Sequence, residues 1–140
     1  MEREDSCLIL LKQLENMLEK RMNQVVLAHD LTVTQAGTLM TIFKFPGEQA
    51  SLKQLEKTLN LSQSVTAGIV VRLERKNLLE SFGDPADRRI KNVKVTPLGE
   101  ELCLNAMGKL KDAEEKALSG LTETEKSIFI SLLKKAIATV

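Results

Sequence analysis

Two helix-start signals lie eleven residues apart in the middle of the chain, and this spacing restricts the fold more than any other feature. Ser51, with Gln54 three residues later, forms a capping box that opens one helix. Asn60 accepts the left-handed conformation of a tight exit turn, and Ser62 can cap a second helix. A short helix, a turn of about three residues and a second helix form a helix-turn-helix. We place the second helix at residues 62–77.

This second helix begins with a polar turn. A helix in the major groove of DNA needs small polar side chains near its N-terminus, where free backbone N–H groups also attract phosphate. Gln63 can form paired hydrogen bonds with an adenine edge, and hydroxyl groups beside it can serve bases or phosphates. The alternative is that Ser62 only caps the helix and the others are solvated. The polar set is Ser62, Gln63, Ser64 and Thr66, and the predicted buried face, at four-residue spacing, is Val65, Ile69 and Leu73.

Two segments of strand character follow the helix-turn-helix. They cover residues 78–82 and 90–96, and the second alternates apolar and polar residues. Glycine, aspartate and proline at residues 83–85 supply turn chemistry between them. A β-hairpin directly after a helix-turn-helix is a wing, and we place it at residues 82–91.

Two adjacent arginines lie at the tip or returning edge of this wing. Narrow minor grooves concentrate negative potential and favour arginine, so Arg88 and Arg89 can contact a groove or the DNA backbone. Asp87 can hold a guanidinium group in a fixed geometry, which limits the entropy lost on docking. The alternative is an exposed, salt-bridged loop.

Long amphipathic segments at both ends carry more apolar surface than one small domain needs. Within residues 5–29 the apolar positions follow a period close to 3.5, interrupted at Arg21. Such a stripe and its match near the C-terminus would otherwise be exposed, so we expect a homodimer. The alternative is that both helices pack back on their own monomer. The predicted dimerisation residues are Cys7, Leu11, Leu14, Leu18, Phe129, Leu133 and Ile137.

Capping signals predict further helices over residues 32–45, 96–118 and 122–140. The expected fold class is mainly α with a small β-hairpin (α+β): a winged helix-turn-helix with N- and C-terminal helices forming a dimerisation region. The expected parts are an N-terminal dimerisation helix at 1–31, a winged helix-turn-helix DNA-binding domain at 32–96, and C-terminal helices at 97–140 that complete the dimerisation region.

Charge is distributed unevenly along the chain. The net charge is only +1, but residues 51–96 contain nine Lys or Arg and five Asp or Glu. The predicted DNA-binding segment is therefore basic, while the rest of the chain is slightly acidic. The chain has no Trp or Tyr, so a site that stacks bases on aromatic rings is not expected.

Four segments together resemble the MarR family of winged-helix transcriptional regulators: LTVTQ, LERKNL, DPADRR and VTPLGEEL. In that family a recognition helix leads into Leu-Glu-Lys/Arg-Lys-Gly-Leu, then a wing with Asp-Pro-x-Asp-x-Arg, then Leu-Thr-x-x-Gly. The resemblance implies an obligate homodimer that binds a pseudo-palindromic operator and is commonly modulated by a small molecule. It also implies that Asp87 orients Arg89 for insertion into a groove.

Five residues depart from the family pattern. Asn77 replaces the usual glycine after the recognition helix, and Ser81 and Phe82 lie where the family often has an arginine. Val71 is commonly acidic in the family, and Gly68 is frequently basic. Gly68 in place of a basic residue predicts fewer contacts from the helix and a modest affinity. The missing arginine near Ser81 leaves open a winged-helix dimer that acts as a non-DNA-binding ligand or protein-interaction adaptor.

Other functional classes find little support in the sequence. The acidic start resembles no secretory signal, residues 58–71 are too short and polar to span a membrane, and two distant cysteines favour the cytoplasm. Cys7 and Cys103 are expected to be buried, inert thiols. One histidine, His29, does not suffice for a closed metal site. We expect no cofactor. The sequence shows no nucleophile–base pair of the kind that catalysis needs, so we do not expect an enzyme.

The expected partners are therefore an operator in double-stranded DNA, a second copy of the chain, and a small-molecule effector of unknown identity. The predicted DNA-binding residues are Ser51, Ser62, Gln63, Ser64, Thr66, Ala67, Arg72, Asp87, Arg88, Arg89 and Lys91.

Overall fold

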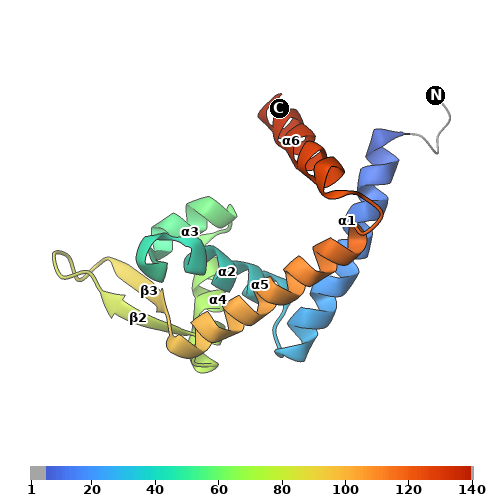
Figure 1. Cartoon of the computed structure of the whole chain (residues 1–140). Coiled ribbons are helices and arrows are strands. Elements are labelled where there is room, and N and C mark those ends of the chain that lie inside the picture. The colour runs from blue at the N-terminus through green and yellow to red at the C-terminus, as the bar shows by residue number, and fades with distance from the viewer. Residues whose placement is uncertain (1–5, 140) are drawn as a thin grey trace. The chain divides into compact units, whose positions relative to one another are not determined.

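The computed structural model describes residues 6–139, which form six α-helices and one three-stranded antiparallel sheet (Figure 1). This is the mainly α class with a small hairpin that the sequence predicts. The predicted start of the first helix, at Asp5, lies outside the described residues. The elements are α1 (Cys7–Ala28), α2 (Val33–Lys44), the 3-10 turn η2 (Pro46–Glu48), β1 (Gln49–Ser51), α3 (Leu52–Leu59), α4 (Gln63–Arg75), β2 (Leu79–Gly83), β3 (Lys91–Val95), α5 (Pro97–Ala117) and α6 (Glu123–Thr139).

The predicted helix caps are present. Ser51 Oγ accepts from the backbone N–H of Gln54 at 3.1 Å, and the Gln54 side chain accepts from the backbone N–H of Ser51 at 2.8 Å. The same reciprocal pair forms between Thr122 and Glu125 before α6. Each box satisfies two donors that a helix start would otherwise leave free.

The helix-turn-helix also closes as predicted. Asn60 adopts a left-handed conformation with φ of 54°, and Ser62 Oγ accepts from the backbone N–H of Val65 at 3.2 Å. The second helix, α4, ends at Arg75, two residues before the predicted end at residue 77. The reason is that Asn77, with φ of 61°, is itself in the left-handed conformation that terminates the helix.

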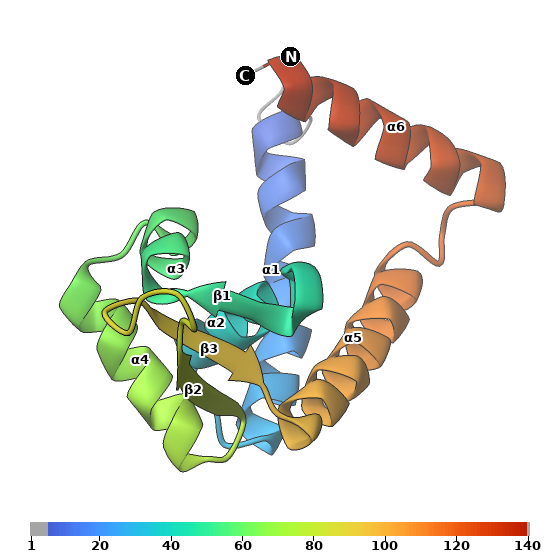
Figure 2. The ribbon, with the colours of Figure 1, turned by 90° about the vertical axis from the view of Figure 1, so that its left-hand side faces the viewer.

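The sheet contains one strand that was not predicted from the sequence. β3 lies between β1 and β2, so Val93 pairs with Ala50 on one side and Ser81 on the other (Figure 2). β1 has only three residues and follows a Pro-Gly turn, which is why local pattern predicted no strand there. Its partner is more than forty residues away in sequence, and only the folded chain brings the two together.

Two compact units make up the chain. One comprises Asn23–Gly108, and the other comprises the described residues before and after it. The first unit contains the core, formed where α2, α3 and α4 pack against each other and against the sheet. Its buried apolar residues are Leu31, Leu39, Ile42, Ala50, Leu55, Ile69, Val70, Leu73, Leu78, Leu79, Val93, Val95 and Cys103.

The predicted buried face of α4 is wrong at its first position. Val65 is 49% exposed, whereas Thr66 is fully buried with Ile69 and Leu73. A stripe at strict four-residue spacing rotates by about 40° at each step of a helix with 3.6 residues per turn, so Val65 lies at the edge of that face. Thr66 takes its place because i, i+3, i+4 and i+7 lie on one side of a helix.

A close contact fixes the start of α5 against the base of the hairpin. Thr96 Oγ1 accepts from the backbone N–H of Gly99 at 3.0 Å, and the backbone N–H of Thr96 donates to the carbonyl of Leu78 at 3.1 Å. A Cβ atom on Gly99 would lie 2.4 Å from the Leu78 carbonyl oxygen. Glycine is therefore required where the first turn of α5 lies against the Leu78 carbonyl, just before β2 begins.

Candidate nucleic-acid interface

The first turn of α4 presents most of the predicted polar residues to solvent. Ser62, Gln63 and Ser64 are exposed, and Ala67 is half-buried. Ser51 is also half-buried and caps α3. The prediction that Thr66 contacts DNA is wrong. Thr66 is fully buried, and its hydroxyl has no hydrogen-bond partner among the described residues. Since no atom of Thr66 reaches the surface, it cannot contact DNA in this conformation.

Arg72 lies across the exposed side of α4. Its Nη1 atom is 3.6 Å from the position that a Cβ atom on Gly68, one turn earlier, would occupy. The missing side chain at Gly68 therefore gives the guanidinium group room to lie along the helix. The departure from the family pattern at Gly68 thus changes the shape of this surface as well as its charge.

The hairpin tip holds Arg89 in a fork. Arg89 Nε donates to Asp87 Oδ1 at 3.1 Å, and Arg89 Nη2 donates to Asp87 Oδ2 at 3.2 Å. The backbone N–H of Arg89 also donates to Oδ1, at 3.0 Å. These hydrogen bonds lower the pKa of the Asp87 carboxyl group below its ordinary value. The Arg89 side chain nevertheless remains 91% exposed.

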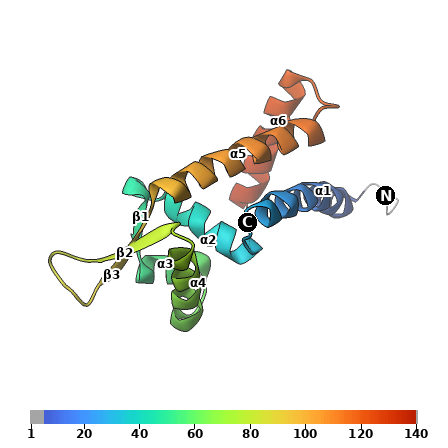
Figure 3. The same cartoon turned by 90° about the horizontal axis from the view of Figure 1, so that it is seen from below.

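Hydrogen bonds within the loop shape the tip. The Asp84 side chain accepts from the backbone N–H of Ala86 at 2.8 Å, and the backbone N–H of Asp84 donates to the carbonyl of Ile90 at 3.2 Å. The arginine fork therefore belongs to an organised loop at the end of the hairpin, which extends away from α3 and α4 (Figure 3). Arg88 and Lys91 beside the fork are exposed.

The end of α4 is attached to two neighbouring elements. The Ser81 hydroxyl on β2 hydrogen-bonds to the Glu74 carboxylate, joining the helix to the hairpin. Lys76 Nζ donates to the carbonyl of Asp30 and lies 3.5 Å from Oε1 of Gln35. Neither attachment was predicted, because partners up to 46 residues apart give no local signal in the sequence. Together they fix α4 relative to the hairpin and to the start of α2.

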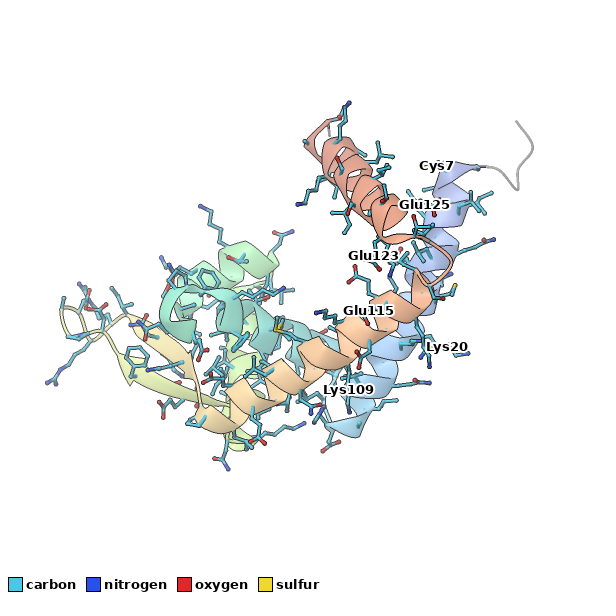
Figure 4. The ribbon with its side chains drawn as sticks, viewed as in Figure 1. Cys7, Lys20, Lys109, Glu115, Glu123 and Glu125 are labelled. Atoms are coloured by element: carbon cyan, nitrogen blue, oxygen red, sulfur yellow. The ribbon has the colours of Figure 1, made fainter. Side chains whose placement is uncertain are left out.

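The two cysteines differ in environment. Cys103 is buried, as predicted, and burial raises its pKa to about 11, with smaller contributions from the carboxylates of Glu48 and Glu100. Cys7, in the first turn of α1, is exposed in the single chain, so its predicted burial requires a second copy of the chain (Figure 4). Across residues 6–139, no group of three or more His, Cys, Asp or Glu side chains is arranged to hold a metal ion.

The terminal helices leave much apolar surface open. Neither α1 nor α6 buries a single described residue. Of the predicted dimerisation residues, Cys7, Leu11 and Ile137 are exposed, while the other four are half-buried: Leu14, Leu18, Phe129 and Leu133. Leu8, Leu10, Met17 and Leu132, which widen the apolar stripes recognised in the sequence, are exposed as well, and so are Ile128 and Ile130, which were not predicted.

An open depression of about 380 Å³ lies between α1 and the end of α5. Arg21 and Lys116 line it together with the carboxylates of Asp112 and Glu115, and Ser119 completes the lining. Of these lining residues, Figure 4 labels Glu115. The two positive and two negative groups balance, so this depression does not select an ion of either sign.

A helix-turn-helix followed by an arginine-tipped hairpin places the chain in the winged-helix class. The MarR family model matches residues 29–90. The transcriptional regulator HosA from Escherichia coli O111:H- is 30% identical over 107 residues, which are 76% of this chain and 77% of HosA. The chain therefore belongs to the MarR family of transcriptional regulators. Neither description is that of an enzyme.

Solved structures share the fold at lower identity. A MepR–DNA complex from S. aureus aligns with a TM-score of 0.76 at 21% identity, over 96% of this chain and 98% of MepR. BpsR from Bordetella bronchiseptica, whose DNA binding is regulated by 6-hydroxynicotinic acid, aligns with a TM-score of 0.72 at 24% identity, over 97% and 96%. At these identities the likeness shows the fold alone.

Within residues 6–139, no helix combines the length and the apolar character that crossing a bilayer requires.

Proposed function

We propose that this protein is a homodimer that binds a pseudo-palindromic operator through residues 62–77 and the wing at 82–91. The observation that carries the proposal is the Asp87–Arg89 fork: a guanidinium group oriented by two side-chain hydrogen bonds and still exposed. Orienting an arginine that stays in solvent is useful where it must meet an anionic partner in a fixed geometry.

Positive charge on both proposed contact elements supports a DNA partner. Arg72 and Arg75 are exposed on α4, and Arg88, Arg89 and Lys91 are exposed on the hairpin. Contacts to phosphates supply most of the affinity, and polar side chains in the first turn of α4 supply contacts to base edges. The MepR structure contains DNA, which makes the same type of partner reasonable for a chain of this fold.

The apolar surfaces of α1 and α6 support the homodimer. Helices that bury none of their described residues within the chain need another partner for their leucines and isoleucines. A second copy supplies an identical surface, and two-fold symmetry then repeats the recognition helix for the second half of an operator. The parts we assign to dimerisation remain residues 1–31 and 97–140, with the winged helix-turn-helix at 32–96.

A small-molecule effector is the third part of the proposal. BpsR, which shares the fold, has its DNA binding regulated by 6-hydroxynicotinic acid. For this chain we propose an effector of some kind, which alters operator affinity by changing the separation of the two recognition helices. A screen of small molecules for release of the operator would identify this effector.

An electrophoretic shift assay with DNA from upstream of the gene tests the proposal. We expect a shifted complex that weakens steeply as salt rises, because each phosphate contact releases counterions. Unrelated DNA of equal length is the control, and it should bind more weakly at the same salt concentration. No salt-sensitive shift with any fragment would refute operator binding and favour the adaptor function instead.

A further inference from the structure

Two exposed valines on α4 are not accounted for by the polar contacts proposed above. Val65 is 49% exposed and Val71 is 36% exposed, although the same helix buries Ile69, Val70 and Leu73 completely or nearly so. Valine is a weaker helix former than alanine and gains nothing from contact with water. Their exposure leaves two apolar side chains on the surface of α4 that an apolar group of a partner can contact.

The helix geometry places both valines around one glycine. The inner side of α4 is marked by its buried residues, Thr66, Ile69, Val70 and Leu73. Gly68 lies about half a turn around the helix from this buried side, and therefore on the outer side. Val65 and Val71 are three residues before and after Gly68, and residues three apart are neighbours on a helix surface. Gly68 is half-buried and lies between these two apolar side chains, with the Arg72 guanidinium group beside it.

The major groove offers one apolar group that fits this surface. Guanine, cytosine and adenine present donors and acceptors there, whereas thymine presents a methyl group, which small apolar side chains contact. A glycine between two valines lets the backbone approach closely, which a larger residue would prevent. We propose that Val65 and Val71, on either side of Gly68, contact thymine methyl groups and so contribute to the sequence specificity of this protein.

This inference rests on the proposed function, because it assumes that α4 enters the major groove. Charge favours DNA over a protein at this surface, since exposed Arg72 and Arg75 flank the valines on the same helix. Two valines also form much less apolar area than a stable protein interface of about 1,600 Å² requires. The polar first turn, with Gln63 and Ser64, would read neighbouring bases.

The test replaces thymine by uracil, which differs only by the methyl group. One thymidine at a time in a bound operator fragment is changed from dT to dU, on both strands, and affinity is measured by fluorescence anisotropy at fixed salt. Burying a methyl-sized group contributes about 0.8 kcal/mol, so we expect about a fourfold loss at one or two positions in each half-site.

The valine variants assign the effect. In Val65→Ala or Val71→Ala, the ratio of dT to dU affinity at one of those positions should fall from about four to near one. Val33→Ala is the matched control, because Val33 is also exposed but lies at the start of α2, outside the helix-turn-helix. That variant should keep the wild-type ratio.

The possible results separate the two proposals. If the wild-type protein binds no fragment in a salt-sensitive way, the proposed function itself fails. If it binds specifically and no dT to dU change weakens binding, the proposed function survives and the methyl contact is overturned. A loss that persists unchanged in both alanine variants also overturns the assignment to these valines.

Discussion

Arg89 combines an ordered side chain with high exposure. Three hydrogen bonds from this one residue end on the Asp87 carboxylate, two from the guanidinium and one from the backbone. An exposed ion pair adds little to stability, because water competes for both groups. The arrangement therefore matters for the direction of the guanidinium group, and its effect should appear in binding to DNA.

Arg89→Ala should weaken operator binding by about tenfold or more, the range for one arginine contact to a base or groove. The free energy of unfolding should change by less than about 0.5 kcal/mol, as for other surface substitutions. Anisotropy at fixed salt measures the first, and urea denaturation measures the second. Asp87→Asn keeps the arginine but loosens the fork, so a smaller loss is expected. Unchanged affinity in Arg89→Ala would remove the wing from the mechanism.

A substitution at Thr66 tests whether this residue belongs to the core and not to the DNA-binding surface. Its hydroxyl is buried without a partner among the described residues, so Thr66→Val should preserve shape and raise the free energy of unfolding by about 1 kcal/mol. Operator affinity should stay the same, because Thr66 does not reach the surface. Chemical denaturation and anisotropy measure the two quantities. Ser64→Ala should show the opposite pattern, with weaker binding and little change in stability; a binding defect in Thr66→Val would contradict the structure.

The Cys103 thiol should react slowly with disulfide reagents. Its pKa is raised from 9.0 to about 11, so at pH 8 its thiolate is about a hundredfold scarcer than that of an ordinary cysteine. In a Cys7→Ser variant, reaction with a disulfide reagent should be at least that much slower than in denaturant. The stabilisation from keeping this thiol neutral is complete below pH 9 and is lost as the pH rises toward 11. Rapid modification at pH 8 without unfolding would contradict this.

At the scale of elements, the contact between α5 and the hairpin is the most restrictive. Gly99→Ala places a Cβ atom 2.4 Å from the Leu78 carbonyl oxygen and 2.9 Å from a Val95 methyl carbon. Moving the backbone to relieve this overlap should cost about 1–3 kcal/mol of unfolding free energy. Gly108→Ala in the same helix is the matched control, since nothing lies within 4 Å of its added Cβ atom. It should stabilise the helix slightly; equal effects would disprove the close contact.

Elements whose signals are local were predictable from sequence. Caps such as Ser51 with Gln54, and the left-handed Asn60, depend on residues within one turn of each other, and the structure confirms them. The strand β1 and the attachment of Lys76 to Asp30 depend on distant partners, so no local pattern indicated them. The error at Val65 and Thr66 has a different, local origin, because a strict four-residue spacing drifts by about 40° at each step of an α-helix.

For the whole molecule, the exposed apolar surfaces of α1 and α6 carry the main prediction. Leu132 is 58% exposed and Ile137 is 72% exposed, so a double change to aspartate should leave each chain folded. The same change should disrupt the proposed dimer, because burying each side chain contributes about 1.5–3 kcal/mol and a buried carboxylate is costly. Light scattering should then report one chain per particle.

Val33→Asp is the control for this experiment. Val33 is an exposed apolar residue at the start of α2, outside the parts assigned to dimerisation, and its change should leave the oligomeric state as it is in the wild type. Leu14 and Leu18, selected from the sequence, are half-buried within the chain and test dimerisation less cleanly. Two chains per particle in the Leu132→Asp, Ile137→Asp variant would remove α6 from the interface.

The hairpin is anchored at its base by the Leu78 carbonyl and the Ser81 hydroxyl, whereas the hydrogen bonds of the loop beyond residue 83 join its own residues, from Asp84 to Ile90. Insertions or deletions in that loop would therefore leave the core intact while moving the arginine along the duplex. Changes in the length of this loop would therefore alter which part of a DNA site a regulator of this fold contacts, with little loss of stability.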